Sequence, residues 1–199
     1  MHSEIPAAKR GNWRTGLKGL CVGVLLAGIA GPGCQSANVR EPLPSKMFAN
    51  DSDAQMDFWH TLADKKVTSN EEAFHGLLLY MDGSDPDATY EARVRDLKSR
   101  RLIPPDFKHG PNEAVSRGTL AVAMVGALHI KGGLMMHLVG PTPRYALREL
   151  EYRGLYPISS ENQTFSGAEY LGIIGKMDDY QHTGAPPPVV VKRPATRPT

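Results

Sequence analysis

Two stretches of this chain repeat at a fixed interval, and this repetition constrains the fold more than any other feature of the sequence. VRDLKSRRLIP at 94–104 aligns with LRELEYRGLYP at 147–157 at a constant offset of 53 residues, and five of the eleven positions are identical. Apolar residues recur in both stretches at helical spacing, and each stretch ends at a proline, which stops a helix. We therefore predict two equivalent amphipathic helices.

A second pattern occurs three times. VTSNEEA at 67–73, VSRGTLA at 115–121 and FSGAEYL at 165–171 each place an apolar residue before a hydroxyl, and their starts lie close to 50 residues apart. This order is typical of a helix N-terminus, where the hydroxyl accepts a hydrogen bond from an exposed amide and the apolar residue packs on the first turn. The chain is therefore predicted to contain three copies of a helix–loop–helix unit.

Helix initiation explains most residues of this pattern. Thr68 with Glu71, and Ser166 with Glu169, have the spacing of a capping box. Arg117, in the middle copy, has no such explanation. A positive charge in the first turn opposes the helix dipole by about 0.3–1 kcal/mol. We therefore expect Arg117 to serve a partner, either an internal carboxylate or an external anion.

These patterns predict an all-α fold of three helix–loop–helix repeats at 53–182. The first copy has only a short leading helix, around AQMDFWHTLADK at 54–65. No alternation of strand length occurs in this region. Residues 34–52 are polar and interrupted by prolines, which predicts a flexible tether, and the proline-rich residues 183–199 are expected to form a disordered tail.

The first 33 residues differ in composition from the rest. Four basic residues precede GLCVGVLLAGIAG at 19–31, an apolar run too short to span a bilayer comfortably. A basic segment followed by such a run is typical of a signal peptide, which we place at 1–33.

The residues after this run resemble the signal of bacterial lipoproteins. Gly33 is a small residue directly before Cys34, and the resemblance implies cleavage there and lipid attachment to Cys34. The alternative is an ordinary secretory signal in which the cysteine is incidental. Cys21 would leave with the signal, so the mature chain would hold no disulfide. Gln35 stands where an aspartate would indicate inner-membrane retention, which favours the outer membrane.

Charge and motif content argue against several functions. The whole chain carries 23 basic and 21 acidic residues, but 34–182 carries 16 and 20, which does not suggest a nucleic-acid-binding face. The seven histidines lack the spacing of a metal site, and neither a phosphate-binding loop nor a nucleophile elbow occurs. Glu71 and Glu169 could form a glycosidase pair, but both are better used as helix caps. We expect no enzyme activity, no cofactor and no metal.

The repeats resemble S-layer homology (SLH) repeats. VSRGTLA matches the family motif at the aliphatic residue, the hydroxyl, the arginine and the small residue, and the likeness covers about residues 57–180. The resemblance implies a pseudo-threefold helical bundle. It also implies that motif arginines and nearby acids line grooves that bind cell-wall polysaccharide, commonly a negatively charged one. The ligand-binding residues that it implies in this chain are Arg117, Glu71 and Glu169.

The copies depart from the SLH motif at charged positions. Ser69 and Gly167 stand in place of the arginine in the first and third copies, and Thr119 stands in place of the glutamate in the middle copy. An arginine guanidinium at a helix N-terminus is a good binding site for a carboxylate. Because only the middle copy has one, at most one groove is expected to hold an anionic sugar in the manner of the family.

The segment 131–143 interrupts the exit from the second repeat. Gly132 and Gly133 break the helix, and the following LMMHLVG is more apolar than a surface loop should be. Two interpretations are open: a loop that packs its leucines and methionines into the bundle, or a flap that binds a partner or lies near a membrane.

Taken together, the sequence predicts a non-catalytic lipoprotein of the bacterial cell envelope, anchored in a membrane through Cys34. Its expected partner is cell-wall polysaccharide or a peptidoglycan-associated polymer, and not nucleic acid. The alternative is a structural or protein-interaction lipoprotein whose repeats have lost sugar binding, and whose flap and tail recruit proteins.

Overall fold

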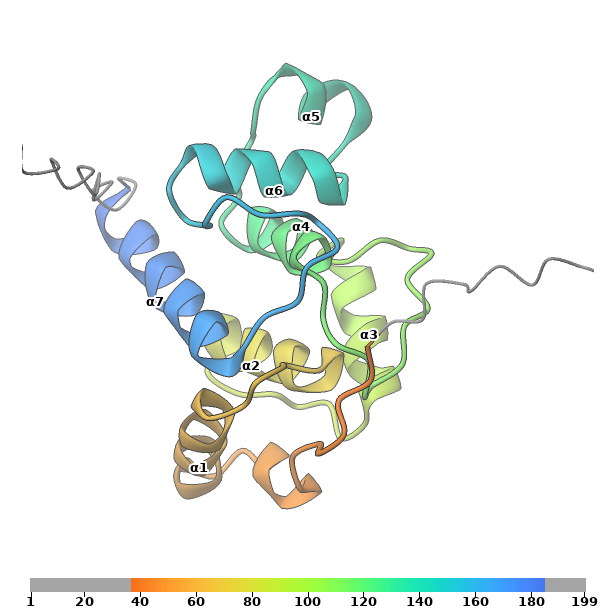
Figure 1. Cartoon of the computed structure of the whole chain (residues 1–199), viewed down its shortest axis with the longest axis vertical. Coiled ribbons are helices and arrows are strands. Elements are labelled where there is room, and N and C mark those ends of the chain that lie inside the picture. Colours follow the sequence, from red (N-terminus) through yellow and green to blue (C-terminus); the bar gives the residue numbers. More distant parts are fainter. Residues whose placement is uncertain (1–36, 185–199) are drawn as a thin grey trace, which may run out of the picture. The chain divides into compact units, whose positions relative to one another are not determined.

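The structure, a computed structural model, describes residues 37–184 (Figure 1). The predicted signal peptide at 1–33, the attachment site Cys34 and nearly all of the predicted tail lie outside these residues. The chain divides by its internal contacts into two units, Met1–Gln35 and Ser36–Thr199, and the described residues all belong to the second.

The described residues form helices joined by loops. Their strand-like contacts are isolated bridges only, so the all-α prediction is confirmed for this part of the chain. In chain order the helices are the 3-10 helix η1 (Ser45–Phe48) and the α-helices α1 (Ser52–Ala63), α2 (Asn70–Asp82), α3 (Tyr90–Ser99), α4 (Arg117–Ala127), α5 (Leu134–Val139), α6 (Pro143–Tyr152) and α7 (Gly167–Thr183).

The two aligned stretches form matching helices. α3 and α6 are both ten residues long, and each is N-capped by a threonine, Thr89 or Thr142, at the predicted offset. Both are followed by a residue with positive φ, Arg101 at 60° and Gly154 at 71°. A left-handed residue at this place ends a helix and turns the chain back over its last turn. The alignment is therefore confirmed at both ends of the helix.

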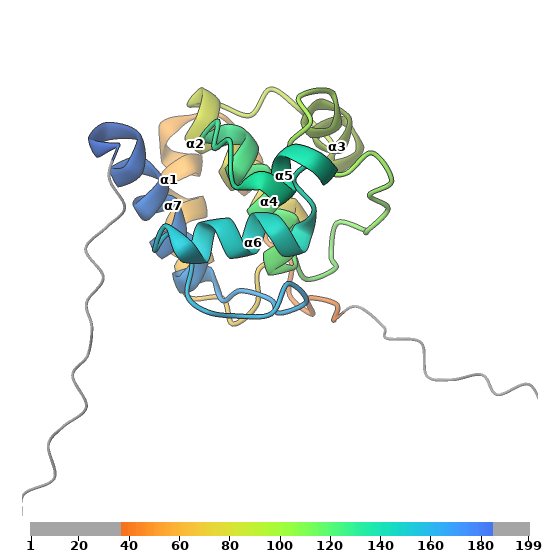
Figure 2. The same cartoon turned by 90° about the horizontal axis from the view of Figure 1, so that it is seen from above.

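The core centres on α2 and α4, which are buried on nearly every side. Ten of the eleven residues of α4 and nine of the thirteen residues of α2 are buried. α6 lies along α4 (Figure 2), and a Cβ at Gly118 would meet the Cβ of Pro143 at 2.7 Å. Helices of this kind must be surrounded by other helices, and the glycine permits the close approach of α6.

The main contacts between long helices join three pairs. α3 packs on α2, α6 on α4, and α1 on α7. The third pair joins the first and the last α-helix of the described residues.

One predicted cap is wrong by a single residue. Ser69, and not Thr68, is the N-cap of α2, and its capping box is completed by Glu72 rather than Glu71. Both pairs have the same spacing, so the sequence offers two registers. The structure selects the one that buries Thr68, which has no exposed surface. The capping box of α7, made by Ser166 and its third-residue glutamate, is confirmed.

The predicted tether is wrong for its described part. Residues 37–48, here called the N-terminal strap, lie against the helices, and Leu43 is buried. The Val39 amide donates to the Asn112 carbonyl at 2.7 Å, and the Ala114 amide donates to the Ala37 carbonyl at 2.7 Å. The strap can lie against the helices with few apolar residues, because main-chain hydrogen bonds to the loop before α4 hold it in place.

The apolar segment at 131–143 contains the short helix α5. Met136 is buried, whereas Leu134, Met135, Leu138 and Val139 are exposed. The interpretation in which this segment packs into the bundle is therefore correct for Met136 only. Among residues 37–184, no helix is both long and apolar enough to cross a membrane.

Candidate functional site

The three cap loops, which end at Ser69, Ser116 and Ser166, meet one another. The Thr68 amide donates to the Phe165 carbonyl at 2.9 Å, and the Val115 amide donates to the Thr68 carbonyl at 3.0 Å. Each of these residues directly precedes a cap, and all are buried. The starts of α2, α4 and α7 are therefore brought together by backbone contacts between distant parts of the chain.

The first amides of these helices make a closed series of hydrogen bonds. The first amide of α2 donates to a carbonyl in the loop before α4, and the first amide of α4 donates to the loop before α7. The first amide of α7 donates to the loop before α2, which closes the series. The bonds, all of 2.7–2.8 Å, run from Asn70 to Glu113, from Arg117 to Gln163, and from Gly167 to Lys65. The amides that a helix N-terminus leaves unpaired are thus satisfied by neighbouring loops, and the three cap loops hold one another in place.

Arg117 is used inside this arrangement. Its Nη2 donates to Glu169 Oε1 at 2.7 Å, its Nε donates to the Thr164 carbonyl at 3.2 Å, and its guanidinium lies 4.7 Å from the ring centroid of Phe165. Only 7% of its side chain is exposed, against 49% for Glu169. The partner expected for Arg117 is therefore present within the chain, as a carboxylate of the third cap.

Glu169 remains charged at this place. The Ser166 amide holds the pKa of Glu169 below its usual value, and Arg117 adds to this effect against the opposing influence of burial. The carboxylate balances the guanidinium, so the pair carries no net charge. The positive charge on which the expected binding of an anionic sugar depends is thus already neutralised.

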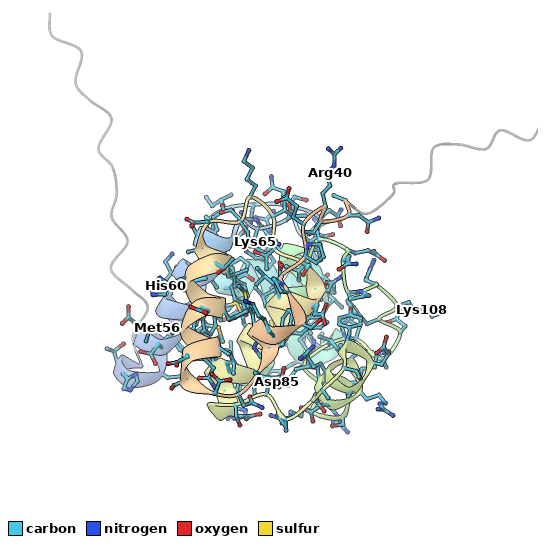
Figure 3. The ribbon with its side chains drawn as sticks, turned by 90° about the horizontal axis from the view of Figure 1, so that it is seen from below. Arg40, Met56, His60, Lys65, Asp85 and Lys108 are labelled. Atoms are coloured by element: carbon cyan, nitrogen blue, oxygen red, sulfur yellow. The ribbon has the colours of Figure 1, made fainter. Side chains whose placement is uncertain are left out.

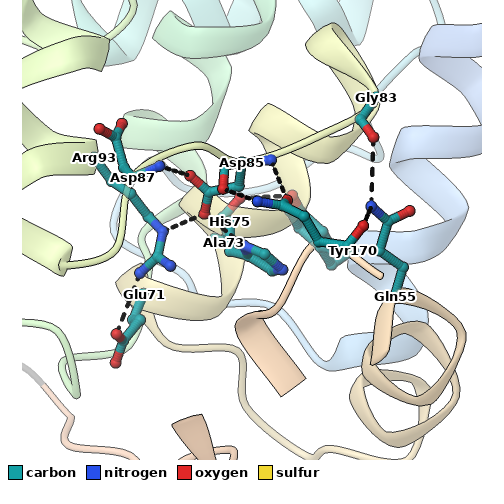
Figure 4. Close-up of polar contacts among 10 residues, drawn as sticks. Gln55, Glu71, Ala73, His75, Gly83, Asp85, Asp87, Arg93 and Tyr170 are labelled. Atoms are coloured by element: carbon teal, nitrogen blue, oxygen red, sulfur yellow. Dashed lines mark hydrogen bonds and ion pairs between the residues drawn. The ribbon is translucent and has the colours of Figure 1, made fainter. Parts of the chain in front are cut away.

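Glu71 lies in a different group of residues. Its Oε1 accepts from Nη1 of Arg93 at 3.3 Å, and about a quarter of its side chain is exposed. Of the three predicted ligand-binding residues, the structure therefore joins Arg117 to Glu169 but pairs Glu71 with a residue of α3 (Figure 4).

The sequence did not identify a polar cluster in the interior of the described residues. Asp85 accepts from His75 Nδ1 at 2.5 Å and also from Arg93 Nε (Figure 4). Burial raises the pKa of Asp85, but the hydrogen bonds from His75 and Arg93 outweigh it, so the pKa lies below its usual value. One signal existed in the sequence: a histidine in the apolar run AFHGLLLY needs a buried partner.

This cluster is structural. The side chains of His75 and Asp85 have no exposed surface, and the rings of Phe48 and Phe58 lie edge-on to His75, with centroids at 4.9 and 4.7 Å. A histidine–carboxylate pair without access from the surface cannot contact a dissolved substrate. It instead joins the loop after α2 to α3 and to the strap.

A groove of about 820 Å³ lies between the strap and the α1–α2 loop (Figure 3). Lys65, at its wall, binds the Glu72 carboxylate at 2.7 Å and the Glu41 carbonyl. Exposed Arg40 and Lys66 face the same groove as exposed Asp64. Its walls thus combine both signs of charge and do not favour a strongly charged ligand.

No family model, curated protein or solved structure matches the chain. Within residues 37–184, no three His, Cys, Asp or Glu side chains lie together as a metal site would require. The candidate site is the Arg117–Glu169 pair with the loop beside it, because both residues belong to the repeated cap pattern.

Proposed function

We propose that this protein is a non-catalytic lipoprotein of the bacterial cell envelope, whose three SLH-like repeats bind cell-wall polysaccharide or another envelope component. The observation that carries the proposal is the closed series of hydrogen bonds among the three cap loops. A chain with unrelated helices has no reason to join three sequence-similar helix starts in this way.

The repeats of the proposal are α1 with α2, α3 with α4, and α6 with α7, and α5 is an insertion. A pseudo-threefold bundle repeats the same kind of helix contact from one repeat to the next. The pairs α3–α2, α6–α4 and α1–α7 support this arrangement. The corrected cap register, with Ser69, Ser116 and Ser166 equivalent, gives spacings of 47 and 50 residues.

This register also accounts for one missing motif arginine. Gly167 occupies the place in α7 that Arg117 occupies in α4, and a Cβ there would overlap the Leu62 carbonyl. Close contact between α7 and the end of α1 therefore excludes any side chain at this position. In the proposed arrangement, the third repeat therefore cannot carry the motif arginine at this position.

The proposed binding surface lies beside Glu169, between the second and third proposed repeats. Half of this carboxylate is exposed, and Arg117 and the Ser166 amide fix its orientation. The neighbouring loop exposes Ser160, Asn162 and Gln163. Sugar hydroxyls can donate to a fixed carboxylate, and such charge-assisted hydrogen bonds are the stronger ones. Because the ion pair is neutral, we propose an uncharged glycan as the ligand.

The test is sedimentation of the unit Ser36–Thr199 with purified bacterial sacculi. The proposal predicts binding that changes little between low and high salt, because no net charge is involved. Binding that disappears at high salt would indicate an anionic polymer instead. No sedimentation at any salt concentration would refute wall binding.

A lipid anchor at Cys34 is the second part of the proposal. Three residues span at most about 11 Å, and Ala37 is already bound to the loop before α4. An acylated Cys34 would therefore hold the domain close to the membrane and not on a long tether. Replacing Cys34→Ala in the full chain should abolish labelling by a fatty-acid probe, and unchanged labelling would exclude the anchor.

The second candidate function is a structural or protein-interaction lipoprotein with degenerate repeats. The burial of Arg117 favours it, because the motif arginine is used by an internal ion pair. Under this alternative the unit Ser36–Thr199 would not bind sacculi, and its exposed surfaces would serve other partners.

A further inference from the structure

The helix α5 exposes a compact group of apolar side chains. Leu134, Met135, Leu138 and Val139 are 74%, 45%, 72% and 57% exposed, and together they form what we call the α5 patch. Figure 1 shows α5 on the outer side of α6, away from α1 and α2. Soluble proteins rarely leave several large aliphatic side chains together at the surface without a binding partner.

Contacts on the inner side of α5 fix its position. Met136 is buried, α5 packs on α6, and Gly140, with a φ of 86°, ends the helix. Because Met136 occupies the side of α5 that faces the protein, the other four apolar side chains lie on the side that faces solvent.

The sequence on either side of the α5 patch is basic. Lys131 and Arg144 stand on either side of it in the chain, both exposed, and His137 is exposed within it. No Asp or Glu occurs between Glu113 and Glu149. Neither Lys131 nor Arg144 has an acidic neighbour in this part of the sequence, in contrast to the paired arginines of α3 and α6.

We propose that the α5 patch docks on the surface of a bilayer that contains anionic lipids. The four aliphatic side chains enter the boundary between headgroups and acyl chains, while Lys131 and Arg144 meet lipid phosphates. A short helix with aliphatic residues on one side and cations at its flanks fits such an interface. A protein partner is disfavoured because the patch lacks the aromatic residues that anchor protein interfaces. The inference depends neither on glycan binding nor on acylation of Cys34.

Flotation with lipid vesicles tests the proposal. The unit Ser36–Thr199 has its own hydrophobic core and lacks the apolar run at 19–31, which would bind membranes by itself. We expect it to float with vesicles of phosphatidylglycerol and phosphatidylcholine, and at least fivefold less with phosphatidylcholine alone. Raising the salt concentration should weaken binding, because it screens the cations.

Two double variants separate the two contributions. Leu134→Ser with Leu138→Ser, and Lys131→Glu with Arg144→Glu, should each reduce flotation at least fivefold. The matched controls are Met56→Ser, an exposed apolar residue of α1, and Lys108→Glu, an exposed cation of a distant loop; both should bind as the wild type.

Three outcomes would overturn the proposal. The wild-type unit could fail to float with anionic vesicles even at low salt. The serine double variant could float as well as the wild type. Finally, the wild-type unit could sediment as a dimer that the serine variant abolishes, in which case the α5 patch serves a second copy of the chain.

Discussion

The guanidinium of Arg117 and the carboxylate of Glu169 form a 2.7 Å ion pair between the starts of α4 and α7, 52 residues apart in the sequence. The pair joins two cap loops, and the Phe165 ring lies under the guanidinium. A cation that opposes the dipole of its own helix is thereby compensated by the capping glutamate of another helix.

Arg117→Ala should therefore destabilise the fold. It removes a nearly buried charge-assisted hydrogen bond and a cation–π contact, for which we expect a loss of about 1–3 kcal/mol in the free energy of unfolding. Urea denaturation measures this loss. Arg95→Ala, an exposed arginine of α3, is the control and should stay within about 0.5 kcal/mol of the wild type. An unchanged stability for Arg117→Ala would mean that the ion pair contributes nothing to folding.

The corrected cap of α2 gives a prediction for two adjacent residues. Ser69→Ala removes the hydroxyl that accepts from the Glu72 amide and should cost about 1 kcal/mol. Thr68→Val should cost little or be stabilising, because the buried Thr68 Oγ1 has no hydrogen-bond partner. Thermal denaturation of the two variants decides the register. The opposite order of stability would restore Thr68 as the cap.

Two glycines of α7 should respond in opposite ways to alanine. Gly167→Ala forces a Cβ into the Leu62 carbonyl, so α7 must move away from α1, with a loss of about 2 kcal/mol or more. Gly172→Ala meets no atom within 4 Å and should stabilise the helix by about 0.5–1 kcal/mol. Chemical denaturation compares both with the wild type, and equal effects would refute the close contact at Gly167.

The buried cluster predicts a loss of stability in acid. The pKa of Asp85 is lower in the folded chain than in the unfolded chain, so near and below pH 4 the unfolded chain binds more protons. The stabilisation by the ionised carboxylate is thus fully present above about pH 4 and is lost as the pH falls through the folded-state pKa.

Asp85→Asn should lower stability at pH 7 by about 3–5 kcal/mol, because buried Arg93 loses its buried carboxylate and keeps only the partly exposed Glu71 as a charged partner. It should also flatten the dependence of stability on pH below about pH 4, where the unfolded-state carboxyl becomes protonated. Urea midpoints measured across this range check both effects, with the exposed Asp106→Asn as the control. An acid transition as steep as that of the wild type would show that Asp85 does not control it.

The helical class and the α3–α6 alignment could be predicted because they depend on local spacing. Apolar periodicity and a stop signal determine where such a helix begins and ends, and both lie within a dozen residues. The cap register at Thr68 and Ser69 could not be predicted, since either residue has an acid three positions later. Burial of Thr68 against Phe165, almost a hundred residues away, makes the choice.

The strap and the interior cluster illustrate what local patterns omit. Residues 37–48 have no periodicity, and their position depends on main-chain hydrogen bonds to a loop more than 70 residues later. Asp85 lies in a loop and Arg93 on a helix with several charges, so nothing local distinguishes them from surface residues. For Arg117, the sequence indicated the need for a partner but could not choose between Glu169 and an external anion.

Binding of the unit Ser36–Thr199 to sacculi, compared between Glu169→Gln and Glu91→Gln, tests the proposed function most directly. The amide introduced by Glu169→Gln would keep an acceptor for the Ser166 amide. It would lose the charge that strengthens hydrogen bonds from sugar hydroxyls and that pairs with Arg117, so urea denaturation must show that the variant is folded. We predict a fall in affinity of about fivefold, or about 1 kcal/mol, for this variant. The exposed Glu91 of α3 lies outside the proposed surface, so Glu91→Gln should bind as the wild type. Equal affinities for the two variants, or no binding by the wild type, would contradict a glycan site beside Arg117 and Glu169.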